Sequence, residues 1–352
     1  MTAKVLLRGL RGRWIGLAIA VVLVAQGFGL QAAPPATAGC PPQAGTDAEL
    51  LAAADIGAAI AAAGRTLVNG SGKLWKVEAS GGAPPSTLVG TFHLPIGGAE
   101  IPPAAVEAAV RAARLVLVEI TRSDMETEMQ AAMVADPGLV MQFDRPPLSA
   151  LLSPAEARLA DEALAALGLS LAVVDRFRPW AVFLMTALPP CVMLELAETE
   201  TSGLDERIVA LAEANGIEVR SLETFLEIID HLDPDTPERT RRMLVATVGM
   251  AKESETRLHD TRALYSAAEI GAIWELARAD LAAVGLLEAP DEAMAEFWEI
   301  LVAGRNAKMV ERAAPELERG GVVVAVGALH LPGEDGIIER LRARGFTVTR
   351  LD

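Results

Sequence analysis

The sequence predicts an α/β fold of the mixed α+β type, in which a central mixed sheet joins strands from both ends of the chain. Three observations predict it. Short apolar, β-branched segments lie near both termini, and the long region between them has mainly helical patterns. Two of the apolar segments also end in nearly the same seven residues, VGTFHLP at 89–95 and VGALHLP at 326–332. We expect the two terminal parts of the chain to form one central sheet, so the repeat is not evidence for two independent domains.

The first 38 residues have the pattern of an export signal. Four basic residues precede an uncharged, mostly apolar stretch at 14–30, and Ala36-Thr37-Ala38 offers a small-residue cleavage site. An uncleaved anchor in the inner membrane is the alternative, because the apolar stretch approaches the roughly 17–25 residues that span a bilayer. We therefore expect an exported protein, periplasmic or secreted, with membrane contact only through an uncleaved leader.

The rest of the chain is strongly acidic. The leader has four basic and no acidic residues, so its removal takes the formal charge from -16 to -20. That charge argues against nucleic acid as a partner. The two cysteines, Cys40 and Cys191, favour one disulfide in an exported protein, with two free thiols as the alternative. Oligomeric state does not follow from these observations.

Apolar and β-branched segments bounded by glycine, proline or polar residues predict six strands, at 74–78, 86–89, 115–119, 217–222, 322–326 and 346–350. Helical patterns fill most of the remainder, at 47–63, 102–113, from 153, 178–189, 204–214, 237–258, 265–283, 290–314 and 335–344. Residues 39–63 then form a linker and helix, and 64–352 form the main domain. We expect a helical insertion at about 122–314 that folds against the sheet.

The repeated segments carry two of the four histidines, His93 and His330, each three residues after a glycine. Two acidic residues, Glu119 and Glu223, also follow predicted strands. Open α/β sheets collect ligand sites at the carboxyl edge, so these four side chains are expected to meet there. Two imidazoles and a carboxylate can hold a divalent metal and leave a position for water or substrate. Buried, hydrogen-bonded histidines and a glutamate in a helix's first turn are the structural alternatives.

Arg305 and Asn306 lie on a predicted helical segment. Arg305 could pair with a site carboxylate or stabilise an oxyanion, and Asn306 could orient a neighbour; a solvated helix face is the alternative. His231 and His259 lack the repeat context, and we expect them to be solvent-exposed and structural. The nucleophile-elbow, zincin and dinucleotide-binding motifs have no convincing match.

These residues resemble the TraB/GumN family of bacterial proteins, which is related to the animal Tiki metalloproteases. The resemblance covers roughly residues 64–352. Its anchors are LWKV at 74–77, GTFHLP at 90–95, LVE at 117–119, RPW at 178–180, SLET at 221–224, Arg305-Asn306 and GALHLPG at 327–333. It implies a divalent-metal-dependent peptidase fold, with His93, Glu119 and His330 as the metal ligands. Relatives often carry Glu-Gln where this chain has Glu227-Ile228, which weakens the case for a glutamine role near Glu223.

Two classes of function follow. The first is an exported metal-dependent hydrolase acting on a peptide or protein, with Glu223, Arg305 and Asn306 assisting the metal ligands and Glu223 as base or fourth ligand. The metal could be Mn, Co or Zn. The second is a non-catalytic periplasmic binding or accessory protein of the cell envelope or a polysaccharide pathway, built on the same scaffold.

Overall fold

A six-stranded sheet organises the computed structural model, which describes residues 57–94, 103–189, 191–192, 203–251 and 254–352. The strands are β1 (Leu74–Glu78), β2 (Ser86–Thr91), β3 (Leu115–Val118), β4 (Glu218–Ser221), β5 (Val322–Gly327) and β6 (Thr347–Arg350). Their order in the sheet is β4-β3-β5-β2-β1-β6. β1 is antiparallel to both neighbours and the other neighbouring pairs are parallel, so the predicted mixed sheet is confirmed.

The strand order brings distant segments together. β5, near the C-terminus, lies between β2 and β3 from the N-terminal part, with Gly90 opposite Val326 and Thr91 opposite Gly327. The two histidine-bearing segments are therefore adjacent and nearly in register. A Cβ on Gly90 would lie 2.7 Å from Leu331 Cδ1, so the glycine permits this close approach.

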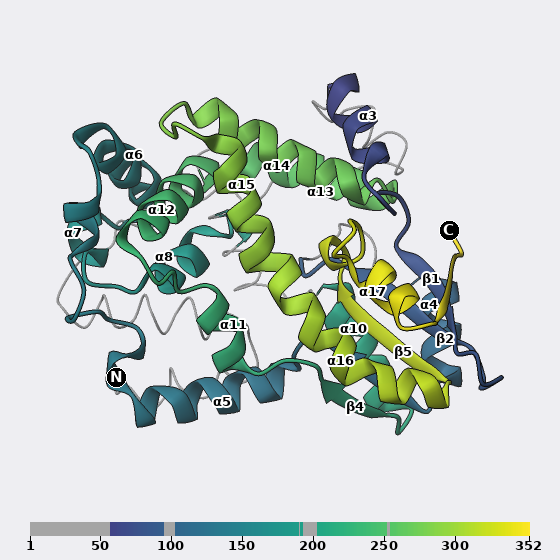
Figure 1. Cartoon of the computed structure of the whole chain (residues 1–352). Helices are drawn as coiled ribbons and strands as arrows, with labels where there is room; N and C mark the ends of the chain where they lie inside the picture. The colour runs from purple at the N-terminus through teal and green to yellow at the C-terminus, as the bar shows by residue number, and fades with distance from the viewer. Residues whose placement is uncertain (1–56, 95–102, 190, 193–202, 252–253) are drawn as a thin grey trace.

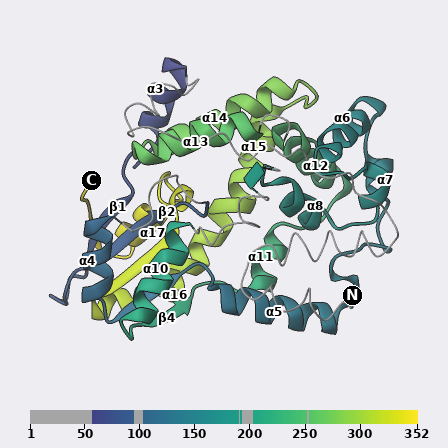
Figure 2. The ribbon, with the colours of Figure 1, turned by 180° about the vertical axis from the view of Figure 1, so that it is seen from behind.

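Helices cover both faces of the sheet (Figures 1 and 2). On one face, α4 (Ala104–Ala112) and α10 (Leu204–Ala214) pack on Val323 and Ala325 of β5. On the other, α16 (Gly304–Arg319) and α17 (Ile337–Ala343) pack on the alternate residues of the same strand. All six β5 residues are buried, which explains why this strand reads as a continuous apolar segment.

A second body of helices lies beside the sheet (Figure 1). It contains α5 (Arg122–Ala135), α6 (Pro154–Ala165), α7 (Leu171–Val174), α8 (Pro179–Thr186), α11 (Phe225–His231), α12 (Pro237–Ala251), α14 (Ile270–Val284) and α15 (Pro290–Trp298). These helices share one apolar core that includes Trp180 and Phe225. Between α8 and α11 the chain returns to the sheet as α10 and β4, so residues 122–314 are not purely helical.

Most predicted helices are present, with shifted limits. The helix predicted from residue 153 is α6, and it begins with a capping box in which the Ser153 and Glu156 side chains each accept from the other's backbone N–H. The predicted helices at 237–258 and 265–283 are instead α12, α13 (Ser254–Ser266) and α14. The segment predicted as one helix at 290–314 is α15, a π-helical turn at Glu299–Ala303 and α16. α5 and α11 were not predicted.

The N-terminal predictions fall largely outside the described residues. These include the leader, the linker, Cys40 and the start of the helix at 47–63, of which α3 (Ala58–Thr66) is described. Within the described ranges, no helix is long and apolar enough to span a membrane. The Cys40–Cys191 disulfide therefore stays a prediction; Cys191 itself is buried.

Candidate functional site

Four polar side chains follow the four adjacent parallel strands, as the sequence predicts. His93 comes two residues after β2, Glu119 one after β3, Glu223 two after β4, and His330 three after β5 in a short 3₁₀ turn. Parallel strands present their carboxyl ends at one sheet edge, so these side chains are delivered to the same region.

The two histidines converge on one carboxylate oxygen. His330 Nε2 lies 3.6 Å from Glu119 Oε1, and His93 Nε2 lies 4.0 Å from the same atom. Both nitrogens therefore lie within 4.0 Å of one carboxylate oxygen, whereas nitrogens that share one ion at about 2.0–2.1 Å lie no more than about 4.2 Å from each other. His330 is 6% exposed and Glu119 11%, whereas the His93 side chain is 54% exposed. The cluster is thus open to solvent on the His93 side.

Each histidine is oriented through its other ring nitrogen. His330 Nδ1 lies 2.7 Å from Asn306 Oδ1, and the Asn306 amide donates to the backbone oxygens of His330 and Asp335. His93 Nδ1 lies 3.3 Å from Asp205 Oδ2. An Nδ1 hydrogen bond fixes the ring and leaves Nε2 free, as in the outer shell of metal-ligating histidines.

Asp205 reaches His93 because α10 begins directly beside it. Leu204 N–H donates to the Phe92 carbonyl, and a Cβ on Gly203 would lie 2.4 Å from the His93 carbonyl carbon. Because residue 203 is glycine, the first turn of α10 can pack directly against the backbone of Phe92 and His93. Asp205 was not predicted to be functional, since an acidic residue in a helix's first turn is common and gives no distinct signal.

Arg305 joins the two glutamates. Its Nη2 lies 2.9 Å from Glu119 Oε2, while Nε and Nη2 donate to the two Glu223 oxygens at 2.9 and 2.5 Å. Arg305 is 12% exposed and Asn306 is fully buried, so the alternative of a solvated helix face is wrong. Glu223 is neither in a helix nor free: it precedes the Thr224 N-cap of α11, and both its oxygens accept from Arg305. Its position here is that of a partner for Arg305.

Burial and neighbouring charges set the protonation of this cluster. Burial disfavours a charge on Glu119, but His330, Arg305 and His93 lower its pKa well below the usual range. Burial lowers the pKa of His330 to about 3, so its ring is neutral near pH 7. At that pH, Arg305 and His93 are the positive charges that lower the pKa of Glu119. Desolvation by the groups packed around the half-exposed His93 ring opposes its charge, yet Asp205 and Glu119 outweigh this effect and raise the pKa of His93 to about 9. For Glu223, burial outweighs Arg305 and raises the pKa.

Gly327 keeps the centre of the cluster open. Its N–H donates to Glu119 Oε1, and a Cβ placed on it would lie 3.1 Å from both Glu119 Oε1 and His93 Nε2. Among the described residues, no three histidine, cysteine, aspartate or glutamate side chains are already placed so that they could hold a metal ion. Ligand atoms around a tetrahedral ion are about 3.3 Å apart, so the observed distances of 3.6 and 4.0 Å would have to shorten by about 0.3 and 0.7 Å. His330 is already neutral near pH 7, and His93 would release its proton on binding a metal. Together with the ionised Glu119 carboxylate, these side chains are of the donor types that bind a divalent ion.

The region around the first histidine is held by the chain's single tyrosine. Tyr265 Oη donates to the Gly90 carbonyl at 2.8 Å, and its ring lies 5.3 Å from that of Phe92. Sequence reasoning missed this contact because α13 and β2 are distant in the chain. The other two histidines lie outside the cluster and are partly buried, so the predicted full exposure is wrong; His231 Nε2 is buried.

A family model described as the TraB/PrgY/gumN family matches residues 73–350. The chain belongs to this family. The match confirms the predicted TraB/GumN resemblance and spans all six strands and the whole cluster. Comparisons with curated proteins and with solved structures each found no match.

Proposed function

We propose that this TraB/PrgY/gumN family member is an exported, divalent-metal-dependent hydrolase that acts on peptides or proteins. One observation carries the proposal: both histidines turn Nε2 toward the same Glu119 oxygen while their Nδ1 atoms are engaged elsewhere. Two histidines with separate structural roles would have no reason to direct Nε2 toward the same oxygen atom. Export rests on the leader, and the peptide substrate rests on the resemblance to Tiki proteases.

His93, His330 and Glu119 would hold the ion, which would supply Lewis acidity for a carbonyl and lower the pKa of water. Arg305 keeps Glu119 ionised at neutral pH and offsets its charge. Asn306 and Asp205 hold the rings in position. The half-exposed His93 marks the side from which substrate can approach.

Metal analysis of the mature protein purified without chelator tests the proposal, together with cleavage of an unstructured protein substrate. His93→Ala and His330→Ala should each lose metal and cleavage together, because two remaining ligands hold a divalent ion poorly. His259→Ala is the matched control, since it removes a partly buried histidine outside the cluster. Metal content that is unchanged in both cluster variants would refute the metal site. Bound metal without cleavage would instead favour the non-catalytic accessory role.

A further inference from the structure

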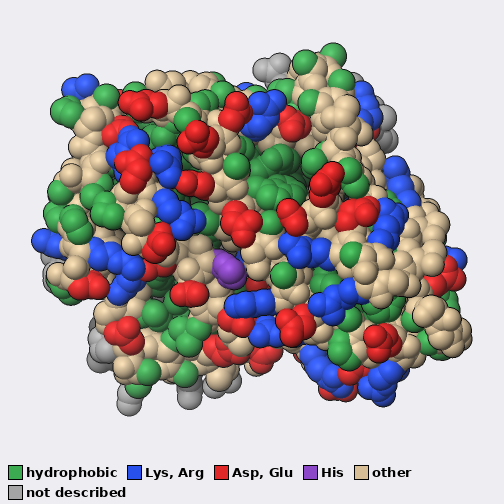
Figure 3. Space-filling model, in the orientation of Figure 1, with side chains coloured by type: hydrophobic (Ala, Val, Ile, Leu, Met, Phe, Trp, Pro, Cys, Tyr) green, Lys and Arg blue, Asp and Glu red, His purple; other side chains and the backbone are tan. Residues whose placement is uncertain are grey.

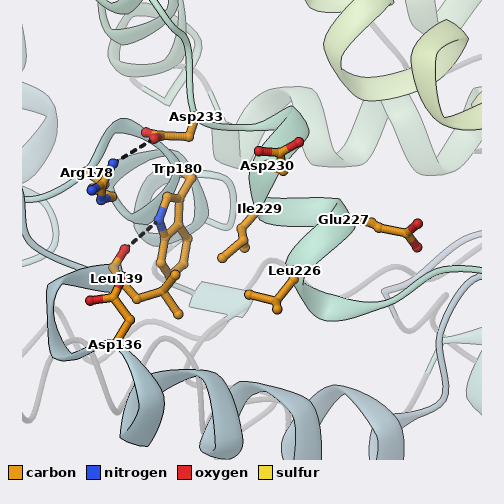
Figure 4. A pocket seen from close by; sticks show the side chains of 9 residues that line it. All are labelled: Asp136, Leu139, Arg178, Trp180, Leu226, Glu227, Ile229, Asp230 and Asp233. Carbon is orange, nitrogen blue, oxygen red and sulfur yellow. Dashed lines mark hydrogen bonds and ion pairs between the residues drawn. The ribbon is translucent and has the colours of Figure 1, made fainter.

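A second feature of the protein is an open pocket of about 420 Å³ that is separate from the histidine cluster. It lies between α5, α8 and α11, and Figure 4 shows its lining. The volume is within the range of small-ligand sites, roughly 300–1,000 Å³. Its chemistry is divided between an apolar floor and a carboxylate rim.

The floor is formed by Leu139, Trp180, Leu226 and Ile229. Trp180 is buried, with its Nε1–H donating to the Leu139 carbonyl at 3.0 Å and its ring packed edge-on against Phe225. Leu226 is 52% exposed, one of few large apolar side chains in the described residues that face solvent to this extent. A ligand that covered Leu226 would gain apolar contact on a floor that is already rigid.

The rim is acidic. Asp136 and Asp230 are exposed, and Asp136 Oδ1 accepts a hydrogen bond from the Gly138 N–H at 2.9 Å. Asp233 pairs through Oδ2 with Arg178 at 3.0 Å and Arg145 at 3.2 Å, which leaves its buried Oδ1 without a hydrogen-bond donor in the described structure.

The remaining lining charges do not offset this rim. Arg178 forms an ion pair with Asp233 and donates a hydrogen bond to the Gly138 carbonyl. Glu227 points away from the floor in Figure 4 and pairs with Arg312 and Lys308. Acidic and basic side chains are interspersed over the face of the molecule shown in Figure 3.

The pocket is connected to the histidine cluster through α11. Leu226, Ile229 and Asp230 lie on this helix, which begins just after Glu223, the partner of Arg305. The helix has seven residues and therefore a length of about 10 Å. An extended peptide covers that length with about three residues. A chain lying across the cluster could therefore place a nearby side chain in the pocket.

We propose that this pocket is a subsite for a lysine or arginine side chain of the peptide substrate. The choice of a peptide rests on the proposed function. The methylene stem would cover Leu226 and Ile229, and the cationic head would face the exposed carboxylates of Asp230 and Asp136. Charge complementarity selects this occupant over a second copy of the chain, whose formal charge of -16 would be repelled.

Binding of two labelled peptides to the metal-free protein tests the subsite without any need for turnover. The peptides are identical except that one carries arginine where the other carries citrulline, which has the same shape without the charge. We expect about fivefold tighter binding of the arginine peptide at low salt, and a smaller difference at high salt. Asp230→Asn should remove most of this preference. Asp291→Asn, which removes a carboxylate that is 83% exposed on α15, should leave it unchanged.

Equal binding of the two peptides to the wild-type protein would overturn the proposal. Equal loss of the preference in both variants would also overturn it, since the effect would then reflect overall charge. This binding assay and the cleavage assay on the metal-loaded protein together separate the two proposals. An arginine preference without cleavage would retain the subsite and reject the hydrolase, and cleavage without the preference would do the reverse.

Discussion

Gly327 offers the sharpest test of the candidate site, through the substitution Gly327→Ala. Its φ of -51° and ψ of 135° are accessible to alanine, and the N–H that bonds Glu119 would be retained. The added methyl group would lie 3.1 Å from Glu119 Oε1 and His93 Nε2, and 3.6 Å from His330 Cδ2. It would therefore enter the space that all three side chains face.

The expected loss of metal affinity follows from those distances. Favourable contacts of a methyl carbon begin at about 3.5 Å, so Glu119 and His93 must each move outward by a few tenths of an ångström. Metal bonds tolerate about 0.2 Å, so at least one ligand should be lost. We expect the affinity for a divalent ion to fall on the order of 100-fold. The free energy of unfolding should change by less than about 1 kcal/mol. Replacing glycine by alanine lowers the entropy of the unfolded chain, and this stabilisation of the fold offsets the cost of the close contacts.

Calorimetric titration with Mn²⁺, Co²⁺ and Zn²⁺, together with thermal unfolding, measures both quantities. Gly81→Ala is the matched control, since its Cβ would have no atom within 4 Å and its φ is not in the left-handed region. If Gly327→Ala bound these ions as tightly as Gly81→Ala, the space between the three side chains would not be a metal site. A large loss of stability in Gly327→Ala alone would contradict the argument that its backbone suits alanine.

Three further predictions concern other parts of the chain. Asp205→Ala should lower metal affinity about 10–100-fold, because His93 loses its Nδ1 partner. Asp205→Asn should lower the affinity less, because asparagine keeps an acceptor for the His93 ring. Equal affinities in both variants and the wild type would exclude a positioning role for Asp205. Burial raises the pKa of Tyr265, so the tyrosinate absorbance of the folded protein should appear at higher pH than that of the unfolded chain. The unfolded chain releases this proton above about pH 10 and the folded one retains it, so stability should fall as pH rises through that value; coincident titrations would contradict this. Thiol titration of exported, unreduced, denatured protein should find no free thiol if Cys40 and Cys191 are bonded, and two free thiols would reject the pairing.

The strands and most of the candidate site could be predicted from the sequence because their signals are local. Each strand is a short apolar or alternating segment between residues that interrupt pairing, and all six predicted strands are observed within a few residues. His93, Glu119, Glu223 and His330 could be predicted to meet because each follows a strand, and parallel strands share one carboxyl edge. The missed helix α11 also had a local signal, the capping box formed by Thr224 and Glu227.

The strand order and the contacts around the cluster were decided only by the tertiary structure. Insertion of β5 between β2 and β3 depends on pairing between segments more than 200 residues apart, which no local pattern encodes. That order determines which atoms meet: it places both Nε2 atoms on one Glu119 oxygen and Arg305 between two glutamates.

Asp205 and the acidic pocket also could not be predicted from local sequence patterns. In the sequence, Asp205 is one of many acidic residues at a helix start, and only the packing of α10 beside Phe92 turns it toward His93. The pocket combines side chains of three helices that share no motif. Residue types and strand ends thus established which chemistry was available. Long-range packing decided which groups face one another, because side-chain contacts depend on positions that the local sequence leaves free.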